Sequence, residues 1–399
     1  MKPFYYLLVI SHALLSSVCS AQWVQKAPYP GGYTDAVVSF TIGDTVYIGA
    51  GSTGSTAFYK YDPSSDQWTK KANIPKRAFA VSFSIGSKGY MALGQSDPAN
   101  IGQASVTNEL WEYDSKTDQW TKKTNFPGNA RDAAFVFVIG NKAYVGGGTD
   151  AANNVYRDFY SYDPSVDKWD TLHFLPDYLY FNAPFVIGNF GYLATGVASS
   201  NETSSLWQYD PSSDSWNPMS DFPGAPRESA ESFALNGKGY VGMGHTQYTT
   251  VFSDFYSYDP AADQWTSIAP FPAAHGRAWA AAVATSTSAF VGLGSYFSGN
   301  SIIANNDFWK FSSSSSVSSS LVAHELAVYP NPGIDFVTLD IPKIEGAAAI
   351  TVRNSIGAIC LTAQINSDRK LDLTSLPAGI YNLEISSGNF RATKQVVKE

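Results

Sequence analysis

The sequence predicts an all-β fold, and three observations support this prediction. Aromatic residues make up 15% of the 399 residues and charged residues also 15%, whereas an ordinary soluble domain carries about 25% charge. Glycine (32 residues) and proline (21 residues) occur along the whole chain, and both disfavour long helices. A pattern of tyrosine, tryptophan and glycine recurs many times. Short strands rich in aromatic residues account for all three features.

The repeat has two signatures. The first runs from a tyrosine through two aspartates to a tryptophan, and its five copies lie at 61–68, 113–120, 162–169, 209–216 and 258–265. The second begins with an aromatic residue and ends in glycine, and its six copies lie at 47–51, 90–94, 144–148, 192–196, 240–244 and 290–294. Successive copies start about 50 residues apart, which is the period of a four-stranded propeller blade.

Each copy divides into four short strands. In one copy, the apolar run 133–139 ends at the turn Gly140-Asn141, a returning strand and a variable loop follow, and an Asp-Pro turn leads into Trp169. Turns of these types join antiparallel strands. Four antiparallel strands repeated radially form a β-propeller.

The two ends of the repeat region predict how the ring closes. The sixth copy ends at Phe311 without a closing tryptophan, whereas residues 23–30 match the outer strand at 68–75. We therefore expect the N-terminal strand to complete the last sheet, which gives six blades and removes the open edge.

Over residues 22–311 the repeat resembles the kelch family. The glycine doublet of that family appears here mainly as Gly-x-Gly, and only 146–148 holds a true doublet. Galactose oxidase is also built on kelch blades, but its copper site needs a cysteine crosslinked to tyrosine and paired histidines. Residues 22–311 contain no cysteine and only His173, His245 and His275, far apart in sequence. We therefore expect no metal site and no cofactor.

The N-terminus reads as an export signal. In residues 1–21, Lys2 is followed by an apolar stretch and by a small-x-Ala cleavage site at Ala21. Cys19 leaves a lipoprotein anchor as an alternative, although the bulky Val18 precedes it. No later segment is apolar over the roughly 18 residues of a membrane span. The expected route is export to the periplasm.

The C-terminal part differs in composition. Residues 312–322 are a serine-rich linker, and 323–399 contain no tryptophan. Three motifs, at 329–332, 376–381 and 394–398, resemble those of the sorting domain of type IX secretion substrates. The resemblance implies a small immunoglobulin-like β-sandwich, the type IX machinery as a partner, and secretion or display on the outer-membrane surface. An ordinary immunoglobulin-like accessory module is the alternative.

The charges narrow the possible partners. The net charge is -8, which excludes a basic nucleic-acid-binding surface. Many of the propeller acids are the paired aspartates of the turns, whose side chains can accept hydrogen bonds from turn amides. The acidity therefore does not identify a ligand.

Four propeller arginines share one repeat position, in the loop that enters each inner strand. They are Arg77, Arg131, Arg227 and Arg277, and Tyr33 and Tyr180 are expected to take this place in the other two copies. These loops should ring the mouth of the central channel. One hypothesis is that the arginines brace the blades, with acids such as Asp132 and Glu228. The other is that they bind an anionic or polyhydroxyl ligand, because arginine presents a planar fork of donors.

Two residues near this position break the repeat. Trp279 lies outside both tryptophan series, and His275 lies in the same loop; both are further ligand-binding candidates. Glu228, Glu231 and His245 offer acid–base groups, but the sequence assigns no residue a catalytic role. The first functional hypothesis is a binding protein that recognises a glycan or a protein at the channel mouth. The alternative is a carbohydrate-active enzyme resembling the six-bladed kelch sialic-acid mutarotases.

Overall fold

The computed structural model describes residues 22–98, 105–246, 250–299, 301–313, 327–329, 331–340, 348–354, 359–365, 369–387 and 390–399. The chain divides into two compact units, residues 1–315 and 316–399. The described residues form strands and no helices. None of them therefore belongs to a helix that is long and apolar enough to cross a membrane. The predicted signal segment and most of the predicted linker lie outside the described residues.

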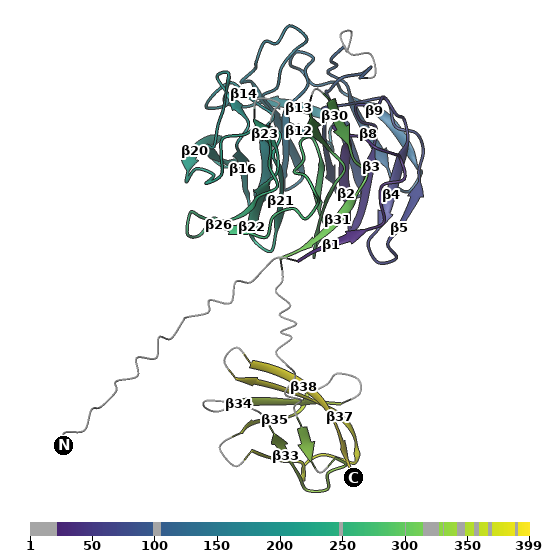
Figure 1. Cartoon of the computed structure of the whole chain (residues 1–399), viewed down its shortest axis with the longest axis vertical. Helices are drawn as coiled ribbons and strands as arrows, with labels where there is room; N and C mark the ends of the chain where they lie inside the picture. Colours follow the sequence, from purple (N-terminus) through teal and green to yellow (C-terminus); the bar gives the residue numbers. More distant parts are fainter. Residues whose placement is uncertain are drawn as a thin grey trace, which may run out of the picture. The chain divides into compact units, whose positions relative to one another are not determined.

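Among its described residues, the first unit contains six four-stranded antiparallel sheets (Figure 1). Blade 1 consists of β2 (Val38–Ile42), β3 (Thr45–Gly49), β4 (Phe58–Asp62) and β5 (Gln67–Lys70). Blade 2 consists of β6 (Val81–Ile85), β7 (Lys88–Ala92), β8 (Leu110–Asp114) and β9 (Gln119–Lys123). Blade 3 consists of β10 (Phe135–Ile139), β11 (Lys142–Gly146), β12 (Phe159–Asp163) and β13 (Lys168–Thr171). Blade 4 consists of β15 (Ala183–Ile187), β16 (Phe190–Ala194), β19 (Leu206–Asp210) and β20 (Ser215–Met219). Blade 5 consists of β21 (Glu231–Leu235), β22 (Lys238–Gly242), β25 (Phe255–Asp259) and β26 (Gln264–Ile268). Blade 6 consists of β27 (Ala281–Ala284), β28 (Ala289–Gly292), β31 (Phe308–Ser312) and β1 (Gln22–Lys26).

The inner strands β2, β6, β10, β15, β21 and β27 contact one another in this order, and β27 contacts β2. The sheets therefore form a closed ring, which agrees with the predicted six-bladed propeller. The last sheet is completed by the N-terminal strand, since β1 pairs with β31 and Trp23 lies opposite Phe311.

Aromatic side chains fill the space between the blades, as predicted. Phe58 of blade 1 packs against Tyr113 and Trp120 of blade 2, with ring centroids 5.0 and 5.3 Å apart. The tyrosines of the turn signature are buried, because their rings lie between neighbouring sheets. Stacked and edge-on rings of this kind stabilise the fold beyond their buried area.

The two aspartates of each turn have different roles, as blade 3 illustrates. Asp163 accepts a hydrogen bond from the backbone N–H of Ser165, which caps the turn. Asp167 accepts one from the hydroxyl of Tyr162 (2.7 Å) and one from the backbone N–H of Thr124 (3.1 Å), in the loop that leaves blade 2. The second aspartate therefore joins neighbouring blades.

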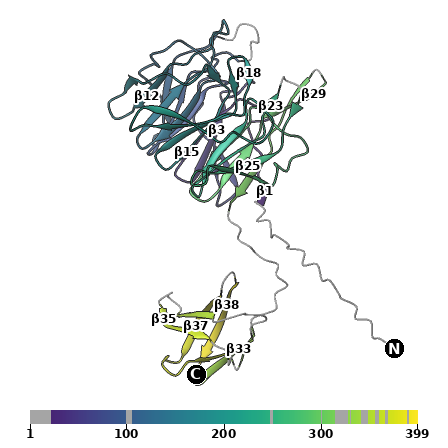
Figure 2. The same ribbon diagram turned by 90° about the vertical axis from the view of Figure 1, so that its left-hand side faces the viewer.

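Three small sheets extend blades 4, 5 and 6 at one end of the ring, where Figure 1 labels β14, β23 and β30 and Figure 2 labels β18, β23 and β29. They are formed by β14 (Leu179–Tyr180), β17 (Val197–Ala198) and β18 (Asn201–Glu202); β23 (His245–Thr246) and β24 (Thr250–Val251); and β29 (Ser295–Ser298) and β30 (Ser301–Ala304). This end also carries the loops that enter the inner strands, and we name it the loop face.

The second unit contains two antiparallel sheets. They are β32 (Ala327–Tyr329), β33 (Phe336–Asp340) and β36 (Lys370–Asp372), and β35 (Ile359–Ile365), β34 (Ala348–Arg353), β37 (Gly379–Ser387) and β38 (Phe390–Lys398). Both sheets contribute to one apolar core, for example Leu339 from the first and Val352 and Leu383 from the second. This arrangement is consistent with the predicted β-sandwich.

Candidate functional site

Each blade enters its inner strand through one residue in the left-handed region. These residues, named here the mouth ring, are Ala36, Phe79, Ala133, Phe181, Ser229 and Trp279, with φ between 50° and 55°. Their backbones form a chain around the channel, since the N–H of Phe181 donates to the carbonyl of Ala133 (3.0 Å) and that of Ala36 to the carbonyl of Trp279 (2.9 Å). Left-handed backbone is costly for residues other than glycine, so hydrogen bonds between blades hold this conformation in place.

The mouth ring alternates between small and aromatic side chains. Blades 2, 4 and 6 contribute Phe79, Phe181 and Trp279, which we name the aromatic triplet, and the other blades contribute alanine or serine. The Phe79 ring lies edge-on to both others, with centroids 5.8 Å from Phe181 and 5.9 Å from Trp279. All three side chains are half-buried. The channel therefore opens on the loop face beside a cluster of accessible aromatic rings.

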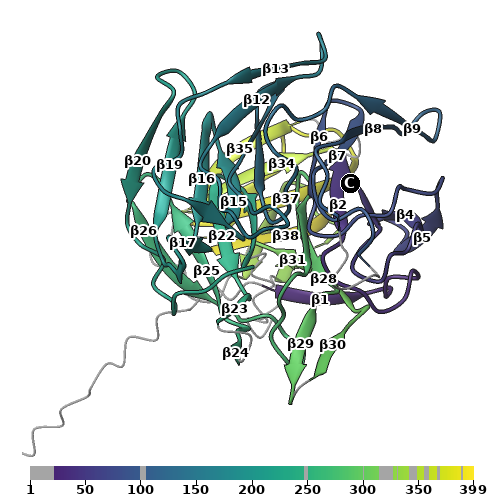
Figure 3. The ribbon, with the colours of Figure 1, turned by 90° about the horizontal axis from the view of Figure 1, so that it is seen from above.

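A cavity of about 290 Å³ lies on the propeller axis, lined by the mouth ring and by residues of the six inner strands. Figure 3 shows the blades arranged around this axis. Its polar lining includes Ser39, Ser82, Asn182 and Ser232. Glu231 is the single ionisable residue among those that line it. Loss of hydration raises the pKa of Glu231 to about 8, although a hydrogen bond with the backbone of Ala280 acts in the opposite direction.

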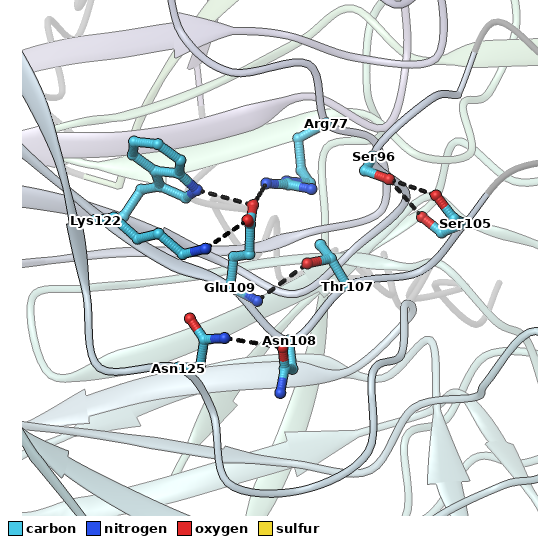
Figure 4. A network of polar contacts seen from close by, with 9 residues as sticks. Arg77, Ser96, Ser105, Thr107, Asn108, Glu109, Lys122 and Asn125 are labelled. Atoms are coloured by element: carbon cyan, nitrogen blue, oxygen red, sulfur yellow. Dashed lines mark hydrogen bonds and ion pairs between the residues drawn. The ribbon is translucent and has the colours of Figure 1, made fainter.

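The four arginines are buried and pair with acids of their own blades. Arg131 and Arg227 each form two hydrogen bonds, to Asp158 and to Asp254, at 2.5 and 2.9 Å in both pairs. Arg77 donates to Glu109, which also accepts from Lys122 and Trp111 (Figure 4). Arg277 donates to Asp307. The partner acids therefore differ from Asp132 and Glu228, the examples expected from the sequence.

Blades 1 and 4 lack the arginine, and their register shows that Tyr33 and Tyr180 do not take its place as the sequence predicts. The last glycine of each Gly-x-Gly strand donates its N–H to the carbonyl of the residue at the arginine position in the next blade, as Gly51 does to Arg77 (2.8 Å). In blades 1 and 4 the acceptors are Thr34 and Leu179. Tyr33 and Tyr180 are each displaced by one residue, because the entry loops of these blades lack the arginine that follows a proline by two to five residues in the other four. These blades also have Ala57 and Ser205 where the other four have the acid.

Of the other predicted site residues, two are exposed at the surface and two lie near the channel mouth. Tyr33 is 68% exposed at the surface. The exposed His275 stacks on Tyr296, with ring centroids 4.2 Å apart. Tyr180 and Trp279 lie near the channel mouth; burial raises the pKa of Tyr180, and the negative charges of Glu228 and Glu202 raise it further.

Glu228, His245 and Trp279 meet at the mouth. Glu228 and His245 exchange two backbone hydrogen bonds of 3.0 Å, and their side chains approach to 3.7 Å between Oε1 and Nε2. The His245 ring lies edge-on to Trp279, with centroids 5.0 Å apart. Both side chains of the Glu–His pair are almost fully buried.

Burial moves the two pKa values of this pair in opposite directions. It raises the pKa of Glu228 to about 7, with a further contribution from the charge of Glu202. It lowers the pKa of His245 to about 4, against the charge of Glu202. At neutral pH the imidazole is therefore neutral, whereas the carboxyl group is close to half-protonated. A group that titrates near the working pH can both donate and accept a proton.

Sequence reasoning missed Phe79, Phe181 and Phe297. Phe79 lies two residues after Arg77, as Trp279 does after Arg277, so the spacing alone could have identified it. Phe181 has no such signal, because blade 4 lacks the arginine. Phe297 of β29 reaches His245 from a variable hairpin, with ring centroids 5.4 Å apart.

Comparison with known proteins identifies both parts of the chain. Residues 129–295 match the KLHDC2/KLHL20/DRC7 Kelch-repeats domain, and residues 327–399 match the secretion system C-terminal sorting domain. The chain thus combines kelch repeats with a C-terminal sorting domain, which supports export. The solved structure of YjhT superposes with a TM-score of 0.62 at 18% identity, over 71% of this chain and 95% of that one. The first unit therefore has the fold of that kelch-type propeller.

Curated relatives share part of the sequence. N-acetylneuraminate epimerase of Pasteurella multocida is 32% identical over 153 residues, or 36% of this chain. N-acetylneuraminate epimerase of Shigella flexneri serotype 5b is 34% identical over 121 residues, or 29% of this chain. The chain spans 39% and 32% of the lengths of these two relatives.

Proposed function

We propose that this kelch-type propeller, which carries a C-terminal sorting domain, is a secreted or surface-displayed protein that binds a glycan at the channel mouth on its loop face. One observation carries the proposal: the aromatic triplet presents half-buried rings at the mouth of an axial cavity. Trp279 has the largest of these rings. Aromatic faces bind the apolar face of a sugar through dispersion and hydrophobic contact.

Polar groups next to the triplet fit the hydroxyl groups of such a ligand. Glu228 and Tyr180 lie near the mouth, and Asn182 lines the cavity behind it. A small number of polar groups beside apolar rings is the usual composition of a small-molecule site. The names of the curated relatives add support, because N-acetylneuraminate is a sugar acid. The buried arginines are not used, since each is paired with an acid.

The test is a glycan array probed with the mature chain and with two variants. Trp279→Ala should lose the hits, because it removes a ring from the mouth. Phe190→Ala should keep them; Phe190 is an exposed ring at the start of β16, beside the hairpin turn from β15 and away from the loop face. Equal signals from wild type and Trp279→Ala would reject the mouth as the binding site.

A second candidate function is epimerisation at the anomeric carbon of N-acetylneuraminate. The Glu228–His245 pair favours it, together with the names of the relatives. Anomer exchange needs a proton removed from the anomeric hydroxyl group and a proton delivered to the ring oxygen. A carboxyl group with a pKa of about 7 can perform both transfers. His245 would then act as a positioning residue that holds Glu228 through backbone and side-chain contacts.

NMR exchange spectroscopy on N-acetylneuraminic acid tests this candidate. The mature chain should accelerate anomer exchange, and Glu228→Gln should remove the acceleration. Asp170→Asn is the control, because Asp170 is exposed and its charge pairs only with Lys168 at the surface. If the wild-type chain causes no acceleration at micromolar concentration, the enzyme hypothesis is rejected while glycan binding stands.

A further inference from the structure

Glu231 breaks the pattern of the inner strands. It is the first residue of β21, and the equivalent residues of the other five inner strands are Val38, Val81, Phe135, Ala183 and Ala281. Those five side chains are apolar and buried. One blade therefore carries a carboxyl group at a position that otherwise belongs to the apolar core. Glu231 itself is only partly buried, and a partly buried ionisable group in a cavity is a candidate for ligand binding.

The charge of Glu231 has no compensating cation in its surroundings. The other residues that line the axial cavity, which come from all six blades, are uncharged. Glu231 takes part in no ion pair with a described residue. The nearest ionisable residues along the chain, Glu228 and Arg227, lie outside the cavity lining, and Arg227 pairs with Asp254. The raised pKa of Glu231 follows from this situation, because burial destabilises the negative form.

An aromatic residue shares the cavity with this carboxyl group. Glu231 forms a hydrogen bond with the backbone of Ala280, and the residue that precedes Ala280, Trp279, lines the same cavity. Tryptophan is the side chain that attracts cations most strongly through its ring face. A carboxylate and a tryptophan in one cavity therefore favour a positively charged ligand.

We propose that the axial cavity binds the primary ammonium group of a small amine, which donates hydrogen bonds to Glu231 and contacts the aromatic triplet. This inference goes beyond glycan binding and does not depend on it. An anion is disfavoured because no cationic side chain among the described residues lines the cavity to pair with it. A divalent metal ion is disfavoured because it needs several oxygen ligands, and the described residues contain no group of three acidic, histidine or cysteine side chains that could hold one. The volume of about 290 Å³ suits a small ligand.

Binding should depend on pH in a defined direction. A cation binds the ionised carboxyl group, so it must displace the proton that Glu231 holds up to a pH of about 8. The affinity should therefore rise between about pH 6 and about pH 9, where an alkyl ammonium group stays protonated as lysine does. No other ionisable side chain lines the cavity to oppose this dependence.

The experiment compares n-butylammonium with n-butanol, which has a similar size and no charge, by calorimetric titration of the mature chain. We expect n-butylammonium to bind more tightly than n-butanol and to bind better at higher pH. Glu231→Gln should weaken n-butylammonium about tenfold, the value of one charge-assisted hydrogen bond, and should leave n-butanol unchanged. Glu231→Ala should also weaken n-butylammonium binding and leave n-butanol binding unchanged. This variant should fold, because blades 4 and 6 carry alanine at the equivalent position.

Two results would overturn the inference. One is equal binding of n-butylammonium and n-butanol to the wild-type chain. The other is unchanged n-butylammonium binding in both Glu231 variants. Glu112→Gln serves as the control for a general charge effect, because Glu112 lies outside the cavity lining and pairs with Lys88. If the chain binds a glycan but does not bind n-butylammonium, only this inference is rejected. If it binds n-butylammonium but no glycan, only the glycan proposal is rejected.

Discussion

Arg131 donates two hydrogen bonds to Asp158, from Nη1 to Oδ1 at 2.5 Å and from Nη2 to Oδ2 at 2.9 Å. The arginine stands at the entry of an inner strand and the aspartate directly before the third strand of the same blade. Arg227 and Asp254 repeat the pair with the same two distances. Blades without the arginine also lack the acid, so the two residues form a structural unit of the blade.

The first prediction concerns this ion pair. Asp158→Ala should lower the free energy of unfolding by about 3 kcal/mol, because it leaves the guanidinium group of Arg131 buried without its counter-charge. Chemical denaturation measures the change. Asp170→Ala, which breaks the exposed pair with Lys168, should cost less than about 1 kcal/mol. Similar small losses in both variants would show that the Arg131–Asp158 pair does not stabilise the blade.

The second prediction concerns the cavity carboxyl group. The pKa of Glu231 rises on folding from 4.5 to about 8, so the folded state holds a proton that the unfolded state has lost. This carboxyl group therefore costs stability progressively as the pH rises from about 4.5 to about 8. Glu231→Gln should stabilise the chain more at pH 8 than at pH 5 in thermal unfolding. A pH-independent difference between variant and wild type would contradict the raised pKa.

The third prediction concerns the link between blades 2 and 3. Hydrogen bonds from Tyr162 and from the backbone of Thr124 lower the pKa of Asp167, although partial burial, the largest single contribution, opposes them. The stabilisation from Asp167 should therefore be complete above its unfolded pKa of about 4 and should be lost as the pH falls through its lower folded value. Asp167→Ala should cost about 1 kcal/mol at neutral pH. Its difference from wild type should shrink in acid, and a difference that stays constant would exclude this linkage.

The fourth prediction concerns the packing of the aromatic triplet. Phe79 touches both Phe181 and Trp279, so Phe79→Ala should let the Trp279 ring move and should weaken glycan binding about threefold. Alanine occurs in the mouth ring of blades 1 and 3, and the variant should therefore fold. Affinity for the strongest array ligand, measured by titration, provides the test. A loss as large as that of Trp279→Ala would instead make Phe79 a direct contact.

The sequence was sufficient for the features that repeat locally. The tyrosine-to-tryptophan signature, first seen at 61–68, predicted the blades, and the match of residues 23–30 to an outer strand predicted the closing strand. Both were visible because each lies within one short stretch of the sequence. The entry register of blade 4 was wrong, since the hydrogen bond from Gly148 to Leu179 fixes it and no spacing in the sequence reveals it. The contact between His245 and Trp279 depends on how blades 5 and 6 pack against each other, and no short stretch of the sequence reveals that packing.

Hydrogen exchange of residues 22–399 with the strongest ligand of the glycan array tests the central claim most directly, because it locates the binding site without any substitution. Binding at the channel mouth predicts slower exchange in the entry segments 177–181, 227–231 and 275–281, with no change in the opposite turns at 43–44, 140–141 and 188–189. Protection confined to those turns, or to residues 327–399, would contradict the account.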